Sequence, residues 1–312
     1  MNHSLTLIIF TLMLFLVSCS TPEIKKTDSF FMNLKLKTSN KNKEIILENI
    51  LEQNIIFSID FNKEGSYILS DDILGSRLKY FCNDFIEDQN IYLESLIFDS
   101  YKIQNKKILI IFSEGFEEYA KELKRRYPDE LYFYLDRNNY EDVIKEIFNV
   151  QNSIDKHVKI SNLDKGLKID HSPRIRNDIS KIYFLLDYGF GKTVVPYVRN
   201  YAFKIDSYSS SEIFHEANDI KKLVDFENLY TSLSGELIRQ IQQKNNIKSI
   251  RDELEKLLIN DFLLIEKVYQ NNLFEDNITL YSSNQDIQNN NKCIDRRFSI
   301  YKISSNDFSN LP

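Results

Sequence analysis

Apolar and polar positions along the middle of the chain follow two patterns, one typical of buried strands and one typical of helices. Residues 108–112 form a continuous apolar run of strand length, and the apolar residues of 116–123 then recur at i, i+3, i+4 and i+7, as on one helix face. The same succession follows at once, with an apolar strand at 131–135 and a helix at 140–148. Two strand–helix units in a row imply right-handed crossovers, and they predict a parallel sheet covered by helices on both faces.

The alternation extends beyond this central part in both directions. On the N-terminal side, strand-like runs at 30–36 and 55–61 flank a helix at 43–53. A polar stretch at 151–177 interrupts the pattern, and after it we expect a strand at 182–186, a helix at 193–201 and a strand at 203–208. The pattern therefore predicts an α/β protein.

The last third of the chain begins with a helix signal and ends in strands. Ser249-x-x-Asp252 resembles a capping box, and the apolar positions between 254 and 269 share one helix face. Two strand-like runs, 278–281 and 298–303, are separated by a polar turn, so we expect a β-hairpin there.

The N-terminus has the pattern of a lipoprotein signal. The apolar run from Leu5 to Val17 is shorter than the roughly 20 residues of a membrane span, and Leu16-Val17-Ser18-Cys19 resembles a lipobox. We therefore expect residues 1–19 to form a lipoprotein signal peptide, Cys19 to carry the lipid, and residues 20–28 to form a polar tether. Because no Lys or Arg precedes the apolar run, an uncleaved anchor or an ordinary secretory signal remains the alternative.

Composition and charge narrow the partners and the chemistry. The formal net charge is -6, which argues against nucleic acid as a partner. No CxxC or HExxH spacing occurs, so we expect no metal site and no cofactor. Cys82 and Cys293 have apolar neighbours, and the sequence leaves open whether they pair or remain two buried thiols. Gly189-Phe190-Gly191-Lys192 lacks phosphate-loop spacing and indicates a helix-opening turn.

Several blocks between 106 and 303 occur in an order that resembles one known family. They are Pro173-Arg174-Ile175-Arg176-Asn177-Asp178-Ile179, then Ile182-Tyr183-Phe184-Leu185, Val195-Pro196, Tyr208-Ser209-Ser210, Asp225-Phe226-Glu227-Asn228-Leu229, Asn260-Asp261-Phe262 and Lys292-Cys293-Ile294-Asp295-Arg296-Arg297-Phe298. In this order the blocks resemble the C-terminal domain of the penicillin-binding-protein activator lipoproteins, the LpoA/LppC family. The long N-terminal helical-repeat domain of that family is absent from this sequence, and the first lobe is compressed.

The resemblance implies a two-lobed fold of the type I periplasmic-binding-protein kind, with parallel sheets. The first lobe would comprise 29–105 and 224–276, and the second lobe 106–223 and 277–312. It also implies a non-enzymatic lipoprotein of the outer membrane that faces the periplasm and activates a class A penicillin-binding protein, a peptidoglycan synthase, by direct contact. Ser20 agrees with the outer membrane, because Asp at that position is the usual signal for retention in the inner membrane. The alternative is a lipid-anchored solute-binding protein that feeds an importer.

Two groups of residues are candidates for a site. Arg174, Arg176 and Asp178 form a charge cluster that either contacts the partner or has a structural role. Tyr208, Ser209 and Ser210 end a predicted strand, where a binding protein of this fold would hold its ligand. Because no matching loop is found in the first lobe, we expect a vestigial cleft.

Overall fold

The computed structural model describes most of the chain from Phe30 onward. The described residues are 30–51, 55–61, 67–99, 106–163, 166, 170–171, 176–243, 247–273, 278–284, 286–287, 293–304 and 308–310. Cys19, the tether and Arg174 lie outside them. In the described part, no helix is long and apolar enough to cross a membrane.

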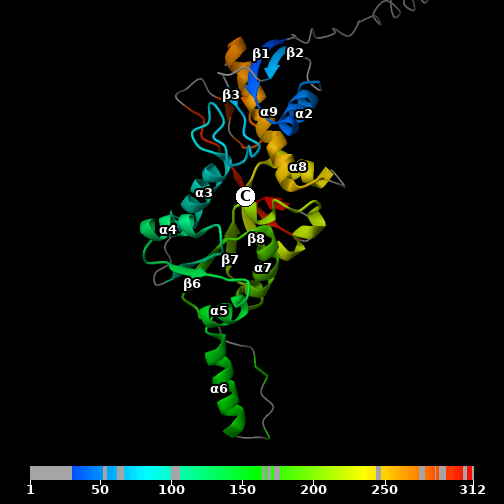
Figure 1. Cartoon of the computed structure of the whole chain (residues 1–312). Helices are drawn as coiled ribbons and strands as arrows, with labels where there is room; N and C mark the ends of the chain where they lie inside the picture. Colours follow the sequence, from blue (N-terminus) through cyan, green and yellow to red (C-terminus); the bar gives the residue numbers. More distant parts are fainter. Residues whose placement is uncertain are drawn as a thin grey trace, which may run out of the picture.

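A seven-stranded sheet forms the larger lobe (Figure 1). Its strands, in spatial order, are β12 (Phe308–Asn310), β11 (Ser299–Ile303), β8 (Leu229–Leu233), β7 (Asp206–Ser209), β6 (Ile179–Leu185), β4 (Lys107–Phe112) and β5 (Leu131–Tyr134). The run from β8 to β5 is parallel, whereas β11 pairs antiparallel with both β8 and β12. The predicted α/β class and mainly parallel sheet are confirmed.

Helices cover both faces of this sheet, as the strand–helix alternation predicts. On one face, α3 (Phe85–Glu94), the short π-helix η1 (Ser95–Asp99) and α4 (Glu117–Arg126) share an apolar cluster with Ile108, Ile110 and Tyr183. On the other face, α5 (Tyr140–Ile147) and α7 (Tyr188–Ala202) pack on the alternate positions of β4 and β6. The two faces therefore use opposite side chains of the same strands.

The smaller lobe has a three-stranded parallel sheet in the order β2-β1-β3. Its strands are β1 (Phe30–Lys37), β2 (Ile55–Phe61) and β3 (Tyr67–Ile68). Met32, Leu34 and Leu36 alternate inward from β1 and pack in one apolar cluster with α2 (Asn40–Leu51) and α9 (Ile250–Asn271). Ser249 is the N-cap of α9, as predicted: its hydroxyl accepts a hydrogen bond from the Asp252 amide at 3.0 Å and donates to Asp252 Oδ2 at 2.9 Å.

The remaining elements are short or project from the body. The helix α6 (Val150–Leu163) extends away from the larger lobe (Figure 1), and Val150 is its one fully buried described residue. The others are α8 (Gly235–Gln243), the 3-10 helices η2 (Ser211–Phe214) and η3 (Ile220–Phe226), and the two-residue strands β9 (Ile278–Thr279) and β10 (Asp286–Ile287).

Three expectations about the architecture are wrong in detail. Residues 224–276 were assigned to the first lobe, yet β8 is a central strand of the larger sheet, because it pairs with β7 and β11. Residues 85–99 were also assigned to the first lobe, but α3 and η1 pack on the larger sheet. The expected hairpin of 278–281 with 298–303 does not form, since β9 pairs with β10 and β11 pairs with β8 and β12.

Candidate functional site between and beside the lobes

The carboxyl ends of the parallel strands in the larger sheet are where ligands bind in open α/β folds, at the point where the strand order reverses. Here that point lies between β4 and β6, because β5 lies on one side of β4 and β6 on the other. A cavity of about 380 Å³ lies at these ends and is lined by 113–115, 134–138, Asp187 and Phe190. All these lining residues belong to the larger lobe. This cavity is called the switch pocket below.

Three polar side chains define the chemistry of the switch pocket. Ser113 is buried, and its hydroxyl has no hydrogen-bond partner among the described residues. At the mouth, Arg137 Nη2 donates to Asp187 Oδ2 at 2.8 Å, and both side chains are well exposed. The polar groups of the switch pocket are thus a buried hydroxyl and an ion pair, and all of them come from one lobe.

Asp187 also explains the turn at Gly189-Phe190-Gly191-Lys192. Its side chain caps α7 by accepting from the Phe190 amide at 2.9 Å. A Cβ on Gly191 would approach Ile213 Cγ1 to 2.7 Å, so this glycine allows α7 to pack against η2. The sequence prediction of a helix-opening turn is confirmed.

The predicted cleft residues Tyr208, Ser209 and Ser210 face the protein interior. The Tyr208 ring stacks on Tyr230 with centroids 5.2 Å apart, on the α3–α4 side of the sheet. Ser209 Oγ donates to the Phe184 carbonyl at 2.9 Å, and Ser210 Oγ donates to Glu212 at 3.1 Å. Each of the three is therefore occupied by a neighbour within the larger lobe.

Gln89 of α3 closes the same end of the sheet. Its Oε1 accepts from the amide and the hydroxyl of Ser211, at 3.2 and 2.8 Å, and its Nε2 donates to the Ser232 carbonyl at 2.6 Å. Ser211 Oγ also lies 2.8 Å from His215 Nε2. Because Ser211 is fully buried, this Ser–His contact gives a substrate no route to the hydroxyl.

No sequence motif identifies the Gln89–Ser211–His215 group, because Gln89 lies 122 residues from Ser211 in the chain. His215 is followed by the polar residues Glu216, Asn218 and Asp219, which favour a solvated loop, but the residue is only 8% exposed. The Arg251 amide donates to the His215 carbonyl at 3.0 Å, and the Ile250 amide donates to the Ala217 carbonyl at 2.8 Å. The N-terminus of α9 is thus hydrogen-bonded to the larger lobe.

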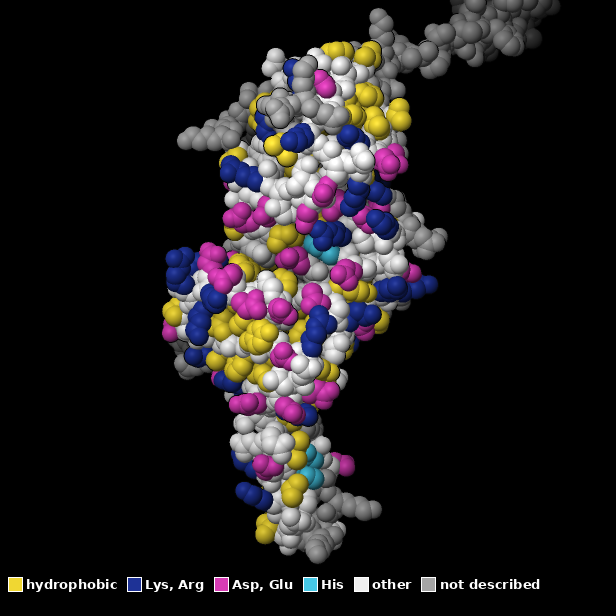
Figure 2. Space-filling view, viewed as in Figure 1, with side chains coloured by type: hydrophobic (Ala, Val, Ile, Leu, Met, Phe, Trp, Pro, Cys, Tyr) yellow, Lys and Arg dark blue, Asp and Glu magenta, His cyan; other side chains and the backbone are white. Residues whose placement is uncertain are grey.

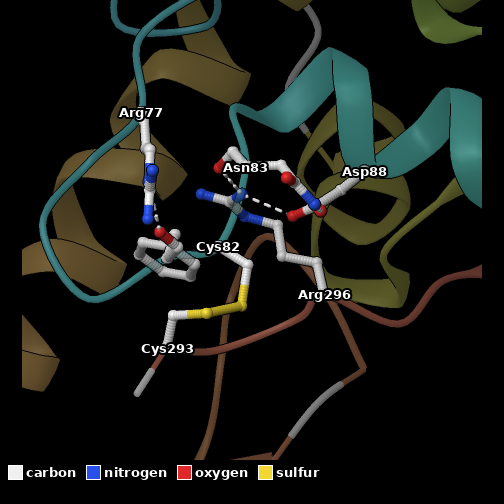
Figure 3. Close-up of a disulfide and its surroundings, with 7 residues drawn as sticks. Arg77, Cys82, Asn83, Asp88, Cys293 and Arg296 are labelled. Atoms are coloured by element: carbon white, nitrogen blue, oxygen red, sulfur yellow. Dashed lines mark hydrogen bonds and ion pairs between the residues drawn. A yellow bond between two sulfur atoms is a disulfide. The ribbon is translucent and has the colours of Figure 1, made fainter.

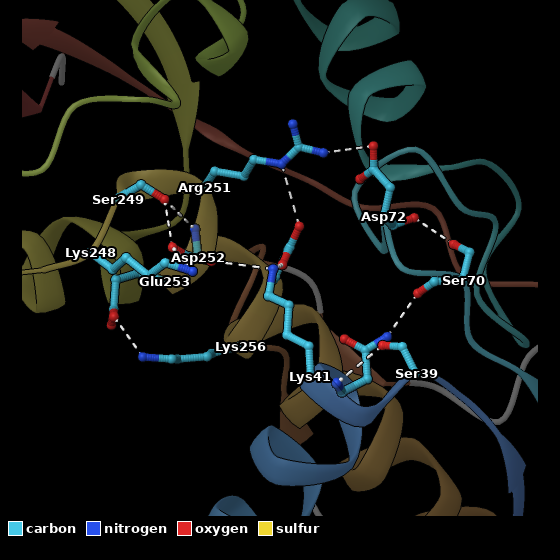
Figure 4. Close-up of polar contacts among 12 residues, drawn as sticks. Ser39, Lys41, Ser70, Asp72, Lys248, Ser249, Arg251, Asp252, Glu253 and Lys256 are labelled. Atoms are coloured by element: carbon cyan, nitrogen blue, oxygen red, sulfur yellow. Dashed lines mark hydrogen bonds and ion pairs between the residues drawn. The ribbon is translucent and has the colours of Figure 1, made fainter.

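Ion pairs fix the same end of α9 within the smaller lobe (Figure 4). Lys41 Nζ contacts Asp252 and Glu255 at 3.3 and 2.5 Å, and Arg251 contacts Asp72 at 2.6 Å and Glu255 at 3.4 Å. One helix end therefore joins α2, the 70–72 segment and the larger lobe.

A disulfide joins two of the segments that cross between the lobes (Figure 3). Cys82 and Cys293 are bonded, with Cα atoms 4.9 Å apart, and the adjacent Phe81 and Ile294 form a parallel β-bridge. The sequence had left bonded and free cysteines open. Arg296 lies beside the bond, fully buried, with Nη1 2.8 Å from Asp88 Oδ2 and its guanidinium 3.7 Å from the centroid of the Phe81 ring. Burial lowers the pKa of Arg296.

A second cavity, about 550 Å³, runs between α3 and α4. Glu94 lies on its inner wall. The Glu94 carboxylate accepts hydrogen bonds from both terminal guanidinium nitrogens of Arg126, and it accepts one from the Tyr119 hydroxyl at 2.7 Å. Burial raises the pKa of Tyr119, with Tyr183 and Glu94 adding to the shift. The carboxylates of Asp84, Glu87, Glu122 and Glu212 also line this cavity.

The predicted contact cluster lies at the other end of β6, where α6 leaves the body. Arg176 Nε donates to Asp178 Oδ1 at 2.6 Å, and the Arg176 amide donates to the Phe148 carbonyl at 3.2 Å. The Arg176 hydrogen bond holds the pKa of Asp178 below its usual value. Both side chains are partly exposed. The pair therefore connects the C-terminal end of α5 with the start of β6, and neither residue lines either cavity.

These features define a type I periplasmic-binding-protein fold, with a mainly parallel sheet in the larger lobe and several segments that cross to the smaller one. No protein-family model and no curated protein sequence matches the chain.

Solved structures of the same fold include an LpoA protein and a putative amino acid transporter protein. LpoA from Haemophilus influenzae, in a monoclinic crystal form, is 10% identical with a TM-score of 0.52, and the match covers 93% of this chain and 60% of that one. A putative branched-chain amino acid ABC transporter protein from Rhodospirillum rubrum is 10% identical with a TM-score of 0.51, covering 91% of this chain and 100% of that one. The C-domain of H. influenzae LpoA, a regulator of PBP1A, is 10% identical with a TM-score of 0.46, covering 90% and 82%. The chain thus spans about 60% of the LpoA chain it matches with the higher score.

Proposed function

We propose that this protein is a regulator of a class A penicillin-binding protein and acts by direct contact, without catalysis of its own. The observation that carries the proposal is the closed end of β7 and β8. There the hydroxyls and amides that could hold a ligand bond to Gln89, Phe184 and Glu212 instead. With the switch pocket lined by one lobe only, the fold supports a contact surface better than a ligand cage.

The proposed location is the periplasmic face of the outer membrane, to which a lipid on Cys19 would attach the protein. Ser20 and the polar run up to Asp28 support this address. In the fold, β1 lies at the end of the molecule opposite α6 (Figure 1), so an anchor at the N-terminal side would leave α6 facing away from the membrane. The pair Arg176–Asp178, at the base of α6, is the proposed starting point for mapping the synthase contact.

The experiment is a binding and activity assay with the class A synthases of the same cell. The protein should bind one of them and raise its rate of peptide cross-linking, with no turnover when the protein is present alone. Arg176→Glu with Asp178→Arg reverses the charges and keeps the pair, whereas Arg239→Glu with Glu236→Arg makes the same exchange on α8 as a matched control. Absence of binding to every class A synthase would overturn the proposal.

A second candidate function, solute binding for an importer, is favoured by the switch pocket and its unpaired Ser113 hydroxyl. Calorimetric titration with branched-chain amino acids distinguishes solute binding from synthase regulation. Micromolar affinity that Ser113→Ala removes, together with no synthase binding, would transfer the assignment to solute binding.

A further inference from the structure

The smaller lobe has large apolar side chains on its outer surface, at the end far from the larger lobe. Phe31 of β1 is 55% exposed and Ile56 of β2 is 58% exposed, and the two are direct neighbours in the strand register. Leu51, the last residue of α2, is 78% exposed, and Leu47 lies one turn earlier at 38%. We call these four residues the apolar tip.

The topology brings the four residues to one edge. Phe31 and Ile56 stand near the N-terminal ends of parallel strands, and parallel strands start at the same edge of a sheet. The helix α2 follows β1 and precedes β2, so its C-terminal end with Leu47 and Leu51 returns to that edge. Figure 2 shows hydrophobic side chains gathered at this end of the molecule, near the point where the chain enters β1.

Among the residues that the structure describes, no helix covers the sheet face that carries Phe31 and Ile56. All-parallel sheets are almost always covered on both faces. In the described part of the smaller lobe, α2 and α9 pack together with the inward residues of β1, and the outward positions 31, 33, 35 and 37 are exposed. An apolar pair on such a face indicates a surface that becomes covered by something else.

The length of chain between the proposed lipid site and β1 limits what that covering is. Ten residues, 20–29, separate Cys19 from Phe30. A chain of that length cannot span more than about 40 Å even when fully extended. A lipid on Cys19 therefore keeps the start of β1, and Phe31 beside it, within that distance of the bilayer surface.

We infer that the apolar tip rests on the lipid bilayer and forms a second membrane contact beside the lipid on Cys19. This inference rests on the membrane address in the proposed function. The tip inserts Phe31, Ile56, Leu47 and Leu51 at the level of the lipid headgroups and acyl-chain boundary, as interfacial apolar side chains do. Its role is to fix the orientation of the molecule, because a single lipid attachment would leave the lobes free to rotate.

The test uses the absence of tryptophan from the chain. A Phe31→Trp variant of the full chain, purified from membranes and reconstituted in phosphatidylethanolamine–phosphatidylglycerol vesicles, gives a single indole fluorophore at the tip. The control is Phe203→Trp, since Phe203 is 70% exposed on the larger lobe. Lipids brominated on the acyl chains should quench the indole of the Phe31→Trp variant and leave the fluorescence of the Phe203→Trp variant unchanged.

A second measurement follows transfer of the lipidated protein between vesicles. Phe31→Ser with Ile56→Ser should raise the transfer rate about tenfold, because two half-exposed apolar side chains no longer leave water on membrane contact. The matched control is Val158→Ser with Ile160→Ser on α6, where the side chains are 49% and 53% exposed. The control pair should transfer at the wild-type rate.

The outcomes separate this inference from the proposed function. Acylated Cys19, measured by mass, together with equal quenching of the two tryptophan variants would overturn the bilayer contact and leave synthase regulation standing. Unacylated Cys19 would overturn both the address and the contact. Self-association that Phe31→Ser removes, with no quenching of the Phe31→Trp variant, would assign the tip to a second copy of the chain and overturn the inference.

Discussion

His215 is held neutral at the junction between the lobes, because burial and then the nearby Arg251 lower its pKa to about 3, against a smaller opposing effect of Asp72. In the unfolded chain its pKa is about 6.5. At pH values between about 3 and 6.5, His215 is protonated in the unfolded chain and neutral in the folded protein. The contribution of His215 to stability is therefore complete above pH 6.5 and is lost as the pH falls toward 3.

We predict that His215→Gln makes the free energy of unfolding less dependent on pH. Between pH 7 and pH 5 the wild-type protein should lose about 2 kcal/mol through this histidine, and the variant should not. Urea unfolding at the two pH values measures the difference. Equal losses in wild type and His215→Gln would show that His215 titrates normally in the fold.

Gln89 provides a second test at the residue scale. Gln89→Leu keeps the side-chain volume but removes a donor from the Ser232 carbonyl and an acceptor from Ser211, in a buried setting. The variant should lose about 2–3 kcal/mol of unfolding free energy. Gln151→Leu, at an exposed position of α6, should change it by less than about 0.5 kcal/mol. A Gln89→Leu protein as stable as wild type would mean that water replaces these bonds.

Single residues at the junction were the hardest to predict from sequence. Ser209 and Ser210 lie at a strand end as predicted, but the partner of the Ser209 hydroxyl is the Phe184 carbonyl, 25 residues earlier, and nothing local specifies it. The sequence around His215 mixes apolar residues, such as Phe214, with polar ones, such as Glu216, so it does not reveal that tertiary packing buries the histidine. Pairing of Cys82 with Cys293 depends on two crossing segments that meet only in the fold.

At the scale of elements, the disulfide holds two crossing segments together over a separation of 211 residues. Closing so long a loop in the unfolded chain reduces its entropy, and the chain-entropy relation gives about 5 kcal/mol for this length. Cys82→Ala with Cys293→Ala should therefore lose on the order of 3–5 kcal/mol of unfolding free energy in urea. The wild-type protein in the presence of reductant should have the same free energy of unfolding as the double variant. Equal stability of oxidised and reduced protein would contradict this.

The helix α6 should contribute little to the stability of the body. Val158, Ile160 and Leu163 are 49%, 53% and 85% exposed, and Val150 at the base is buried. Replacing residues 152–174 by a short Gly-Ser linker should change the free energy of unfolding by less than about 1 kcal/mol. Urea unfolding checks this, and a larger loss would mean that α6 packs on the body in solution. The same variant shows whether α6 contributes to synthase binding.

The sequence predicted most elements of the larger sheet but not all their neighbours. Strands β4, β5 and β6 were recognised because apolar runs alternate with helix-period segments. The antiparallel pairing of β11 with β8 joins residues about 70 positions apart, and short-range patterns carry no information on such a partner. Alternating character in 298–303 therefore indicated a strand, but a local hairpin was the wrong partner for it.

At the scale of the whole molecule, the contacts between the lobes predict a fixed relative orientation. The disulfide, the buried Arg296–Asp88 pair and the hydrogen bonds from the N-terminus of α9 all join segments that cross the junction. The radius of gyration from small-angle X-ray scattering should be the same with and without millimolar leucine. A type I binding protein that closes on leucine serves as the positive control, and compaction of this protein would favour solute binding.

The smaller lobe is assembled from distant parts of the chain, since β1 at 30–37 packs under α9 at 250–271. A chain synthesised from its N-terminus presents Met32, Leu34 and Leu36 long before the helix that covers them. Until then, these side chains are exposed to neighbouring chains, as in folds with many long-range contacts. The smaller lobe consequently cannot complete its core until residues 250–271 are present, and the yield of refolding should fall as the protein concentration rises.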